Sequence, residues 1–220
     1  MYYDVISSLP QLPYFTRAER LPITPLRLEQ RLRRLRPEHA AQLDHARSVL
    51  RWRPERLTAH SDESLLADYA QLLNAELSPQ LHEYVSFRRI QQIMLAALRR
   101  VHDGVGPWEN TRMWSALPHM YHIRQHWDVQ DFGLEYLYPW LPQARECLAA
   151  GDAIGLEQHL MDLNWRWLSR TAEQQMFAFA AVFAYVFQWE MLKDWLQCDA
   201  SQAKARFTEL IDKVTDVKDS

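Results

Sequence analysis

The sequence predicts an all-α protein, folded as a single compact bundle of seven to eight helices around a buried C-terminal helix. Apolar residues recur at helical spacing along most of the chain. Only five glycines occur among 220 residues, which disfavours folds that depend on many tight turns. The one Asp-Gly pair, Asp103–Gly104, follows a helical run and does not join two alternating segments, so no β-hairpin is indicated.

The residue pattern divides the chain into three parts. Residues 1–25 contain four prolines and predict an irregular N-terminal arm, in which residues 2–9 could form either a strand or a helical turn. Residues 26–214 carry the helical pattern and predict one all-helical domain. Residues 215–220 are polar and predict a short tail.

Four helices are expected in the first half of the domain. Leucines at helical spacing in residues 28–35 mark the first, and Pro37 suits the first turn of a second, which reaches about residue 52. Ser61 is expected to cap the third. A serine followed by Pro79 predicts the start of the fourth, a long helix that ends where Gly and Pro occur in residues 102–107.

The middle of the chain predicts less regular structure. Residues 108–142 are rich in Trp, Tyr, Pro and His, and we expect short helices joined by packed loops. A helix over about residues 143–150 follows. A turn at 150–152 is then expected to cap a helix that reaches Trp167.

Twelve consecutive apolar residues, 176–187, predict the central buried helix. Thr171 and Gln174 match a capping box, so we expect this helix to begin there and to end near residue 197. A membrane-spanning helix needs roughly 20 apolar residues, so the run fits a helix inside the protein. Its phenylalanines, four residues apart, are interpreted as core. Asp199 is expected to cap a separate final helix.

Charge is unevenly distributed along the chain. Residues 1–60 contain eleven Arg and six acidic residues, a net charge of +5, whereas the whole chain carries −3. Arg27, Arg31 and Arg34 recur at helical spacing and could bind phosphate or an acidic protein surface. The alternative is a solvated helix face. Because the whole chain is acidic, nucleic acid is not the expected partner.

A histidine-rich segment is the best candidate for a metal site. His119, His122 and His126 would share one face of a helix, and Asp128, Asp131 and Glu135 follow. Imidazoles and carboxylates are ligands for Zn²⁺ or Fe²⁺. The alternative is an exposed polar face, or His N–H groups that donate to nearby carbonyls.

Sequence motifs for catalysis are not found. Neither a G-x-x-x-x-G-K-[ST] loop nor a G-x-S-x-G motif occurs, so we expect no catalytic residues and no cofactor. Cys147 and Cys198 form no C-x-x-C, and the N-terminus has no export signal. These features predict a cytoplasmic protein.

Both ends of the chain resemble one bacterial family. The opening residues 2–12, YYDVISSLPQL, are similar to the start of a family of unknown function encoded in V/A-type ATPase operons. Similar segments follow near the C-terminus, namely WRWL at 165–168, residues 177–185, WEMLKDW at 189–195 and ASQAKARFTELI at 200–211.

The resemblance implies a non-catalytic role in an ion-translocating ATPase. Proteins of that family are thought to replace or accompany the C subunit, an all-helical piece between the central stalk and the membrane ring. Residues 87–100 resemble the Arg- and Leu-rich helices of the C subunit, although this chain is shorter than that three-lobed protein. The implied partners are ATPase subunits, and the implied location is the cytoplasmic face of the inner membrane, reached through those partners.

Two other functions stay open from the residues themselves. One is a metal-dependent helical enzyme that uses residues 119–135. The other is a helical adaptor that binds an unrelated protein.

Overall fold

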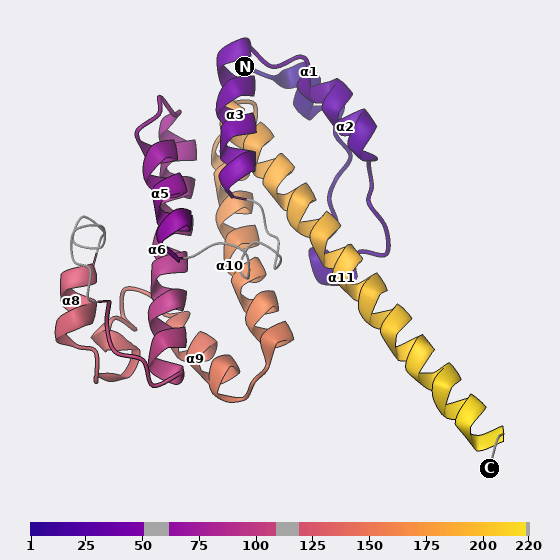
Figure 1. The fold of residues 1–220 in the computed structure, drawn as a ribbon. Coiled ribbons are helices and arrows are strands. Elements are labelled where there is room, and N and C mark those ends of the chain that lie inside the picture. The colour runs from indigo at the N-terminus through magenta and orange to yellow at the C-terminus, as the bar shows by residue number, and fades with distance from the viewer. Residues whose placement is uncertain (51–61, 109–118, 219–220) are drawn as a thin grey trace.

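The computed structural model describes residues 1–50, 62–108 and 119–218, with the backbone alone for 62–66 and 199–218. Every regular element in these residues is helical, so the predicted all-α class is confirmed. Figure 1 shows α6, α10 and the first half of α11 side by side, with the last part of α11 extending away from the other helices.

The described residues contain nine α-helices and two short 3-10 helices. The α-helices are α1 (Tyr3–Ile6), α2 (Pro25–Leu32), α3 (Pro37–Val49), α5 (Asp62–Leu73), α6 (Pro79–His102), α8 (Met120–Gln125), α9 (Leu141–Ala149), α10 (Ala153–Gln174) and α11 (Phe179–Lys218). The 3-10 helices are η1 (Phe15–Arg17) and η2 (Gln130–Gly133).

Prolines begin several of these helices, because their fixed φ suits the first turn and their missing N–H is not needed there. The predicted starts at Pro37 and Pro79 and the predicted end of α6 at His102 are confirmed. Asp152 caps α10, as expected, and its Oδ1 accepts a hydrogen bond from the Gly155 N–H at 2.8 Å. The predicted cap at Ser61 lies outside the described residues, as does the end expected near residue 52.

The N-terminal arm packs on the helices. Residues 3–6 form a helical turn, α1, which decides between the two structures left open for this segment. Tyr2, Val5 and Phe15 are buried, and the Tyr2 N–H donates to the Phe177 carbonyl at 2.7 Å. The arm therefore shares the core of the helical domain.

The predicted helix boundaries near the C-terminus are wrong. The helix expected to end at Trp167, α10, continues to Gln174. Thr171 does not cap a helix but lies in the last turns of α10, where its hydroxyl donates to the Trp167 carbonyl. The following helix, α11, begins only at Phe179. It also continues through Asp199, where a new helix was expected, because the chain there contains neither Gly nor Pro to interrupt the backbone hydrogen bonds.

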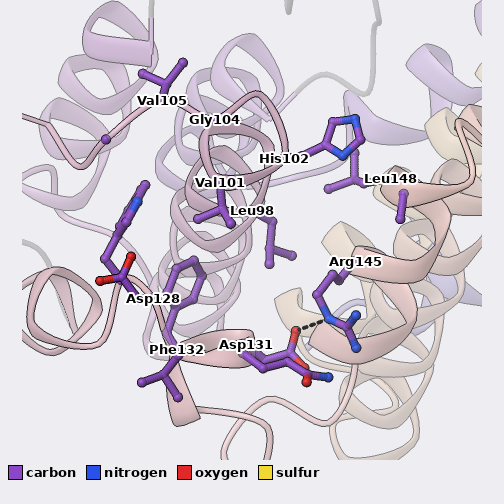
Figure 2. Close-up of a pocket in the computed structure, with 15 residues that line it drawn as sticks. Leu98, Val101, His102, Gly104, Val105, Asp128, Asp131, Phe132, Arg145 and Leu148 are labelled. Carbon is purple, nitrogen blue, oxygen red and sulfur yellow. Dashed lines mark hydrogen bonds and ion pairs between the residues drawn. The ribbon is translucent and has the colours of Figure 1, made fainter.

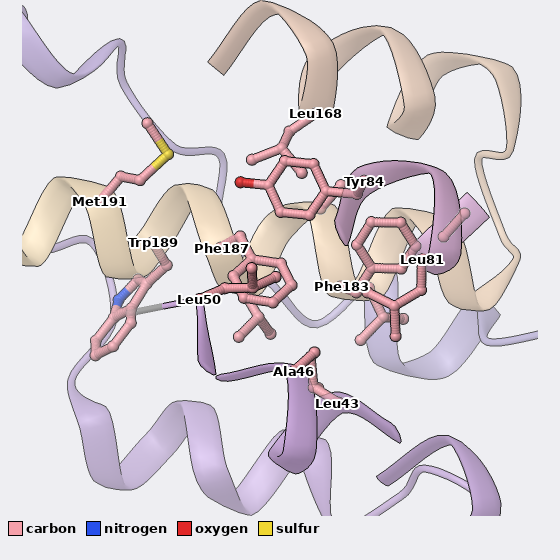
Figure 3. Close-up of a cluster of buried hydrophobic side chains, with 14 of the residues drawn as sticks. Leu43, Ala46, Leu50, Leu81, Tyr84, Leu168, Phe183, Phe187, Trp189 and Met191 are labelled. Carbon is pink, nitrogen blue, oxygen red and sulfur yellow. The ribbon is translucent and has the colours of Figure 1, made fainter. Parts of the chain in front are cut away.

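The first of two hydrophobic cores surrounds the start of α11. Figure 3 shows Phe183 and Phe187 of α11 facing Tyr84 of α6, with Leu43 of α3 beside them. The rings of Tyr84 and Phe187 lie 5.2 Å apart. Phe179, Phe183 and Phe187 are all buried, so their interpretation as core residues is confirmed.

A second core lies at the other end of α6. It contains residues 93–98 of α6, the inner faces of α8 and α9, and Leu156 and Leu160 at the start of α10. Short helices were expected in this region, and α8 and η2 confirm them in residues 119–142. Residues 109–118 lie outside the description.

Three polar side chains lie between the two cores, and we call them the polar layer: Arg88 and Gln91 of α6 and Asn164 of α10. The Arg88 guanidinium donates to Gln91 Oε1 at 3.1 Å. Asn164 Nδ2 donates to the same oxygen at 2.9 Å. The layer thus links α6 to α10 by hydrogen bonds at the point where apolar contacts change from one core to the other.

Within the residues described, the helices include none that is both long enough and apolar enough to cross a membrane.

Candidate functional site

The three arginines predicted to bind a partner lie near the N-terminus of the chain. Arg27 and Arg31 belong to α2, and Arg34 lies in the turn that follows. Arg27 and Arg34 are exposed and Arg31 is half-buried, so together they form the arginine surface. Leu26, 69% exposed, lies beside them. Arginine is one of the residue types enriched at protein–protein interfaces, whereas a single exposed leucine is normal on any protein surface.

The inner face of α2 explains why these arginines point outward. Leu28, Leu32 and Leu35 are buried in the first core. Thr24 Oγ1 accepts a hydrogen bond from the Arg27 N–H and caps the helix. The spacing of leucines and arginines therefore fixes which side of α2 faces outward.

Arg47 holds α2 in place through an arrangement that we call the arginine clamp. Its guanidinium bonds Glu190 of α11 at 2.7 Å and Glu29 of α2 at 2.9 Å. Burial by itself lowers the pKa of Arg47, but the charges of the two glutamates and their hydrogen bonds raise it above the usual value. Since Glu29 is paired with Arg47, the one carboxylate within residues 25–36 is turned toward the clamp and does not neutralise the arginine surface.

Arg34 also lies near the N-terminal arm. Its Nη1 lies 3.6 Å from the Asp4 carboxylate of α1, and both side chains are largely exposed. Such an exposed pair contributes little to stability. It does bring α1 next to the arginine surface.

The histidine-rich segment forms local hydrogen bonds. His119 Nε2 lies 2.8 Å from the Tyr138 hydroxyl. His122 Nε2–H donates to the Phe132 carbonyl at 3.0 Å, and His126 Nδ1–H donates to the His122 carbonyl at 2.9 Å. The rings of His122 and His126 stack with centroids 4.0 Å apart. The interpretation that His N–H groups bond nearby carbonyls is therefore confirmed for these two residues.

The neighbouring carboxylates do not join the histidines. Asp131 is buried and accepts a hydrogen bond from Arg145 Nε at 3.0 Å. Asp128 is exposed, and Glu135 is half-buried. Among the residues that the structure describes, no three His, Cys, Asp or Glu side chains are grouped so that they could hold one metal ion. The structure thus does not assemble the alternative ligand set of His119, His122 and His126.

A groove of about 670 Å³ lies close to this segment, between the end of α6, residues 127–132 and α9. Figure 2 shows Leu98, Val101 and Phe132 on its walls and the Asp131–Arg145 ion pair at one end. Its size is that of a small-molecule site, and its walls are mainly apolar.

The wall of the groove contains an unusual turn that the sequence does not reveal. Asp131, Phe132 and Gly133 have φ values of 51°, 59° and 67°, all in the left-handed region. For the two non-glycine residues this conformation costs about 1–3 kcal/mol each. Burial of Phe132, the ion pair from Arg145 and the hydrogen bond from His122 hold the turn. Only Gly133 gives a sequence signal for it.

Comparison with known proteins identifies the family. The family model described as protein of unknown function (DUF2764) matches residues 46–217, which is more than half of the chain. The match begins after the arginine surface and includes the second core, the part of the first core from Ala46 onward and nearly all of α11. No curated protein and no solved structure matches the chain. The chain belongs to the DUF2764 family of proteins of unknown function.

Proposed function

We propose that this protein is a non-catalytic subunit or assembly factor of a V/A-type ion-translocating ATPase. It acts as a coupling piece between the central stalk and the membrane ring, in the manner of the C subunit. The link to the ATPase comes from the resemblance at residues 2–12 and in the C-terminal half. The way the protein docks is argued from its arginine surface.

The arginine surface is the observation that carries the docking proposal. A coupling piece has to keep its binding surface fixed while it transmits force, and the arginine clamp ties α2 to α3 and α11. Buried leucines beneath α2 hold the same surface from the inside. Close-packed cores of this kind deform little under load.

The charge of the surface indicates the partner's chemistry. Arg27 and Arg31 extend from one helix, and Glu29 between them is engaged with Arg47. A positive surface speeds encounter with an acidic one and fixes the orientation in which they bind. The expected contact is therefore an acidic helical surface on a central-stalk or ring subunit.

Purification of the ATPase from cells tests the assignment. A tag on another ATPase subunit should bring down this chain with the intact enzyme or with assembly intermediates. If the chain is absent from both, the proposed function is wrong.

Charge reversal then tests the docking surface separately. Arg27→Glu with Arg31→Glu should weaken association and reduce its dependence on salt. Arg34 is left unchanged because its reversal would also repel Asp4. The matched control is Arg124→Glu with Arg170→Glu, two exposed arginines on other helices. If both double variants co-purify equally well, the protein docks through a different surface.

A further inference from the structure

Tyr2 of the N-terminal arm and His39 of α3 share a hydrogen bond whose direction follows from a third group. The Tyr2 side chain is buried, and its hydroxyl oxygen lies 2.5 Å from His39 Nδ1. The same oxygen accepts a hydrogen bond from the Arg36 backbone N–H at 3.3 Å. A backbone N–H can only donate, and a phenol hydroxyl has one hydrogen of its own. That hydrogen is therefore assigned to His39 Nδ1, which accepts it only while the nitrogen carries no proton.

The His39 ring lies where three elements meet. It belongs to α3 and contacts Tyr2 of the arm. It also stacks on Phe179 of α11, with centroids 4.2 Å apart and an angle of 4° between the two planes. Phe179 is buried in the first core. A change in the charge of His39 therefore acts directly on the contacts that join the arm to α3 and α11.

The arm has other attachments close to this ring. The Tyr2 backbone N–H donates to the Phe177 carbonyl at 2.7 Å. The Asp4 carboxylate lies 3.6 Å from Arg34 of the arginine surface. Of these contacts, the one with His39 involves a side chain that titrates near neutral pH.

Charged groups from the arm and from α3 act on His39. Burial lowers the pKa of His39 below its usual value of 6.5, and the positive charge of Arg36 lowers it further. Glu38 raises this pKa, and the amino terminus of the arm lowers it. The Phe179 ring of α11 attracts an imidazolium. With a pKa below 6.5 the imidazole is neutral at pH 7, which is the state in which Nδ1 can accept.

We infer that His39 is a proton-sensitive attachment point for the N-terminal arm: neutral His39 accepts the Tyr2 hydroxyl, and protonated His39 loses that bond and holds residues 1–9 less firmly. Protonation places a hydrogen on Nδ1 opposite the hydroxyl hydrogen and adds a positive charge beside Arg36. The contribution of the bond to stability is complete above about pH 6.5 and is lost as pH falls through the lower value of the folded protein. This inference does not depend on the proposed ATPase role.

Tyr2→Phe tests the direction of the hydrogen bond, because it keeps the ring and removes the hydroxyl. The NMR resonances of the His39 imidazole are followed from about pH 8 to about pH 5 in wild type and variant. If Nδ1 accepts, the lost bond had favoured the neutral imidazole, so the pKa of His39 should be higher in Tyr2→Phe. If Nδ1 were the donor, the pKa should fall. Burial, Phe179 and the neighbouring charges are the same in both proteins, so the difference reports the Tyr2 bond. A lower or an unchanged pKa in Tyr2→Phe would overturn the inference.

Hydrogen exchange of the arm tests the consequence. The N–H groups of Ile6, Ser7 and Leu9 are hydrogen-bonded within the arm, so their protection, corrected for the intrinsic exchange rate, reports its local opening. Wild-type protection should be about two- to tenfold lower at about pH 5 than at about pH 7, the effect of one hydrogen bond. His39→Asn places an amide oxygen that does not titrate near the position of Nδ1, so its protection should not change between these pH values.

A second histidine gives the matched control. His82→Asn changes an exposed histidine in the first turn of α6 and should leave the pH dependence of the arm as in the wild type. Far-UV circular dichroism establishes that each variant is folded. Constant wild-type protection between the two pH values, or an equal loss of protection in His39→Asn, would overturn the inference.

Discussion

Asn164 is the residue through which the polar layer can be tested most directly. It lies at the junction of the two cores, and its side chain is 0% exposed. Replacing it with leucine keeps a similar size and removes both the donor and the acceptor of the amide. The substitution therefore measures what the hydrogen bonds between α6 and α10 contribute to stability.

The expected loss of stability in Asn164→Leu follows from three hydrogen bonds. Asn164 Nδ2 donates to Gln91 Oε1 at 2.9 Å and to the Leu160 carbonyl at 2.7 Å, and its Oδ1 accepts from the Tyr84 hydroxyl at 3.3 Å. Each contributes about 0.5–1.5 kcal/mol, and a buried hydroxyl left without an acceptor costs about 1–3 kcal/mol. Apolar burial of the new leucine offsets about 1–2 kcal/mol. We expect Asn164→Leu to lower the free energy of unfolding by about 2–3 kcal/mol.

A double-mutant cycle with Tyr84 makes the test specific. In the wild type, Tyr84→Phe should cost about 1 kcal/mol because Asn164 Oδ1 loses its donor. In the Asn164→Leu background the same change should restore about 1 kcal/mol, because it removes the orphaned hydroxyl. The sign of the Tyr84 effect is thus expected to reverse.

Urea unfolding followed by far-UV circular dichroism and by tryptophan fluorescence provides the measurement. Coincident transitions from the two probes would justify a two-state analysis of all four proteins. An equal effect of Tyr84→Phe in both backgrounds would refute the coupling. A stabilising Asn164→Leu would refute the contribution assigned to the layer.

Three further predictions concern single sites. Arg47→Met breaks the arginine clamp by removing the cation that pairs with Glu190, which is half-buried, and with Glu29, which is exposed. The free energy of unfolding from urea titration should therefore fall by about 1–2 kcal/mol, with partial recovery in Arg47→Lys; an unchanged midpoint would contradict the clamp. Burial, followed by its hydrogen bond to Asp162, raises the pKa of Tyr14 from 10.0 to about 12. The protonated Tyr14 hydroxyl therefore contributes its full stabilisation below about pH 10, and this stabilisation is lost as pH rises through about 12. The stability difference between wild type and Tyr14→Phe should shrink over that interval, and a constant difference would contradict the prediction. Replacing a glycine inside a helix with alanine usually raises stability by about 1 kcal/mol. Gly155→Ala should not do so, because the new Cβ would lie 2.1 Å from the Asp152 carboxylate that caps the helix. In an Asp152→Ala background, the same change should stabilise the protein in thermal unfolding.

Single residues in the sequence predicted correctly where several helices begin. They did not predict that α10 and α11 continue past residues that often cap a helix. Pro37 and Pro79 act within their own turn of helix, so their positions could be read from the sequence. The capping-box pattern at Thr171 is equally local, but packing of α10 extends that helix past it. Asp199 is a common N-cap residue, yet nothing in the backbone requires a break there.

Features that depend on tertiary contacts could not be predicted. Arg88, Gln91 and Asn164 are types usually found on helix surfaces, and packing between helices buries them here. The left-handed turn at Asp131 and Phe132 likewise rests on contacts from Arg145 and His122. By contrast, the exposure of Arg27 and Arg34 follows from the leucine spacing and could be anticipated. The identity of a partner has no such local signal and stays a proposal.

The length of α11 has a mechanical consequence. The described side chains of α11 pack against the first core as far as Trp195 and Leu196, whereas its backbone continues as helix to Lys218. From the turn that contains Leu196, the helical backbone of residues 197–218 continues for about 33 Å at 1.5 Å per residue. A tilt of about 5° at that turn would displace the tip by about 3 Å, roughly half a helical pitch. If the helix stays straight, a slight rearrangement at its base is therefore enough to displace its end by the rise of two residues.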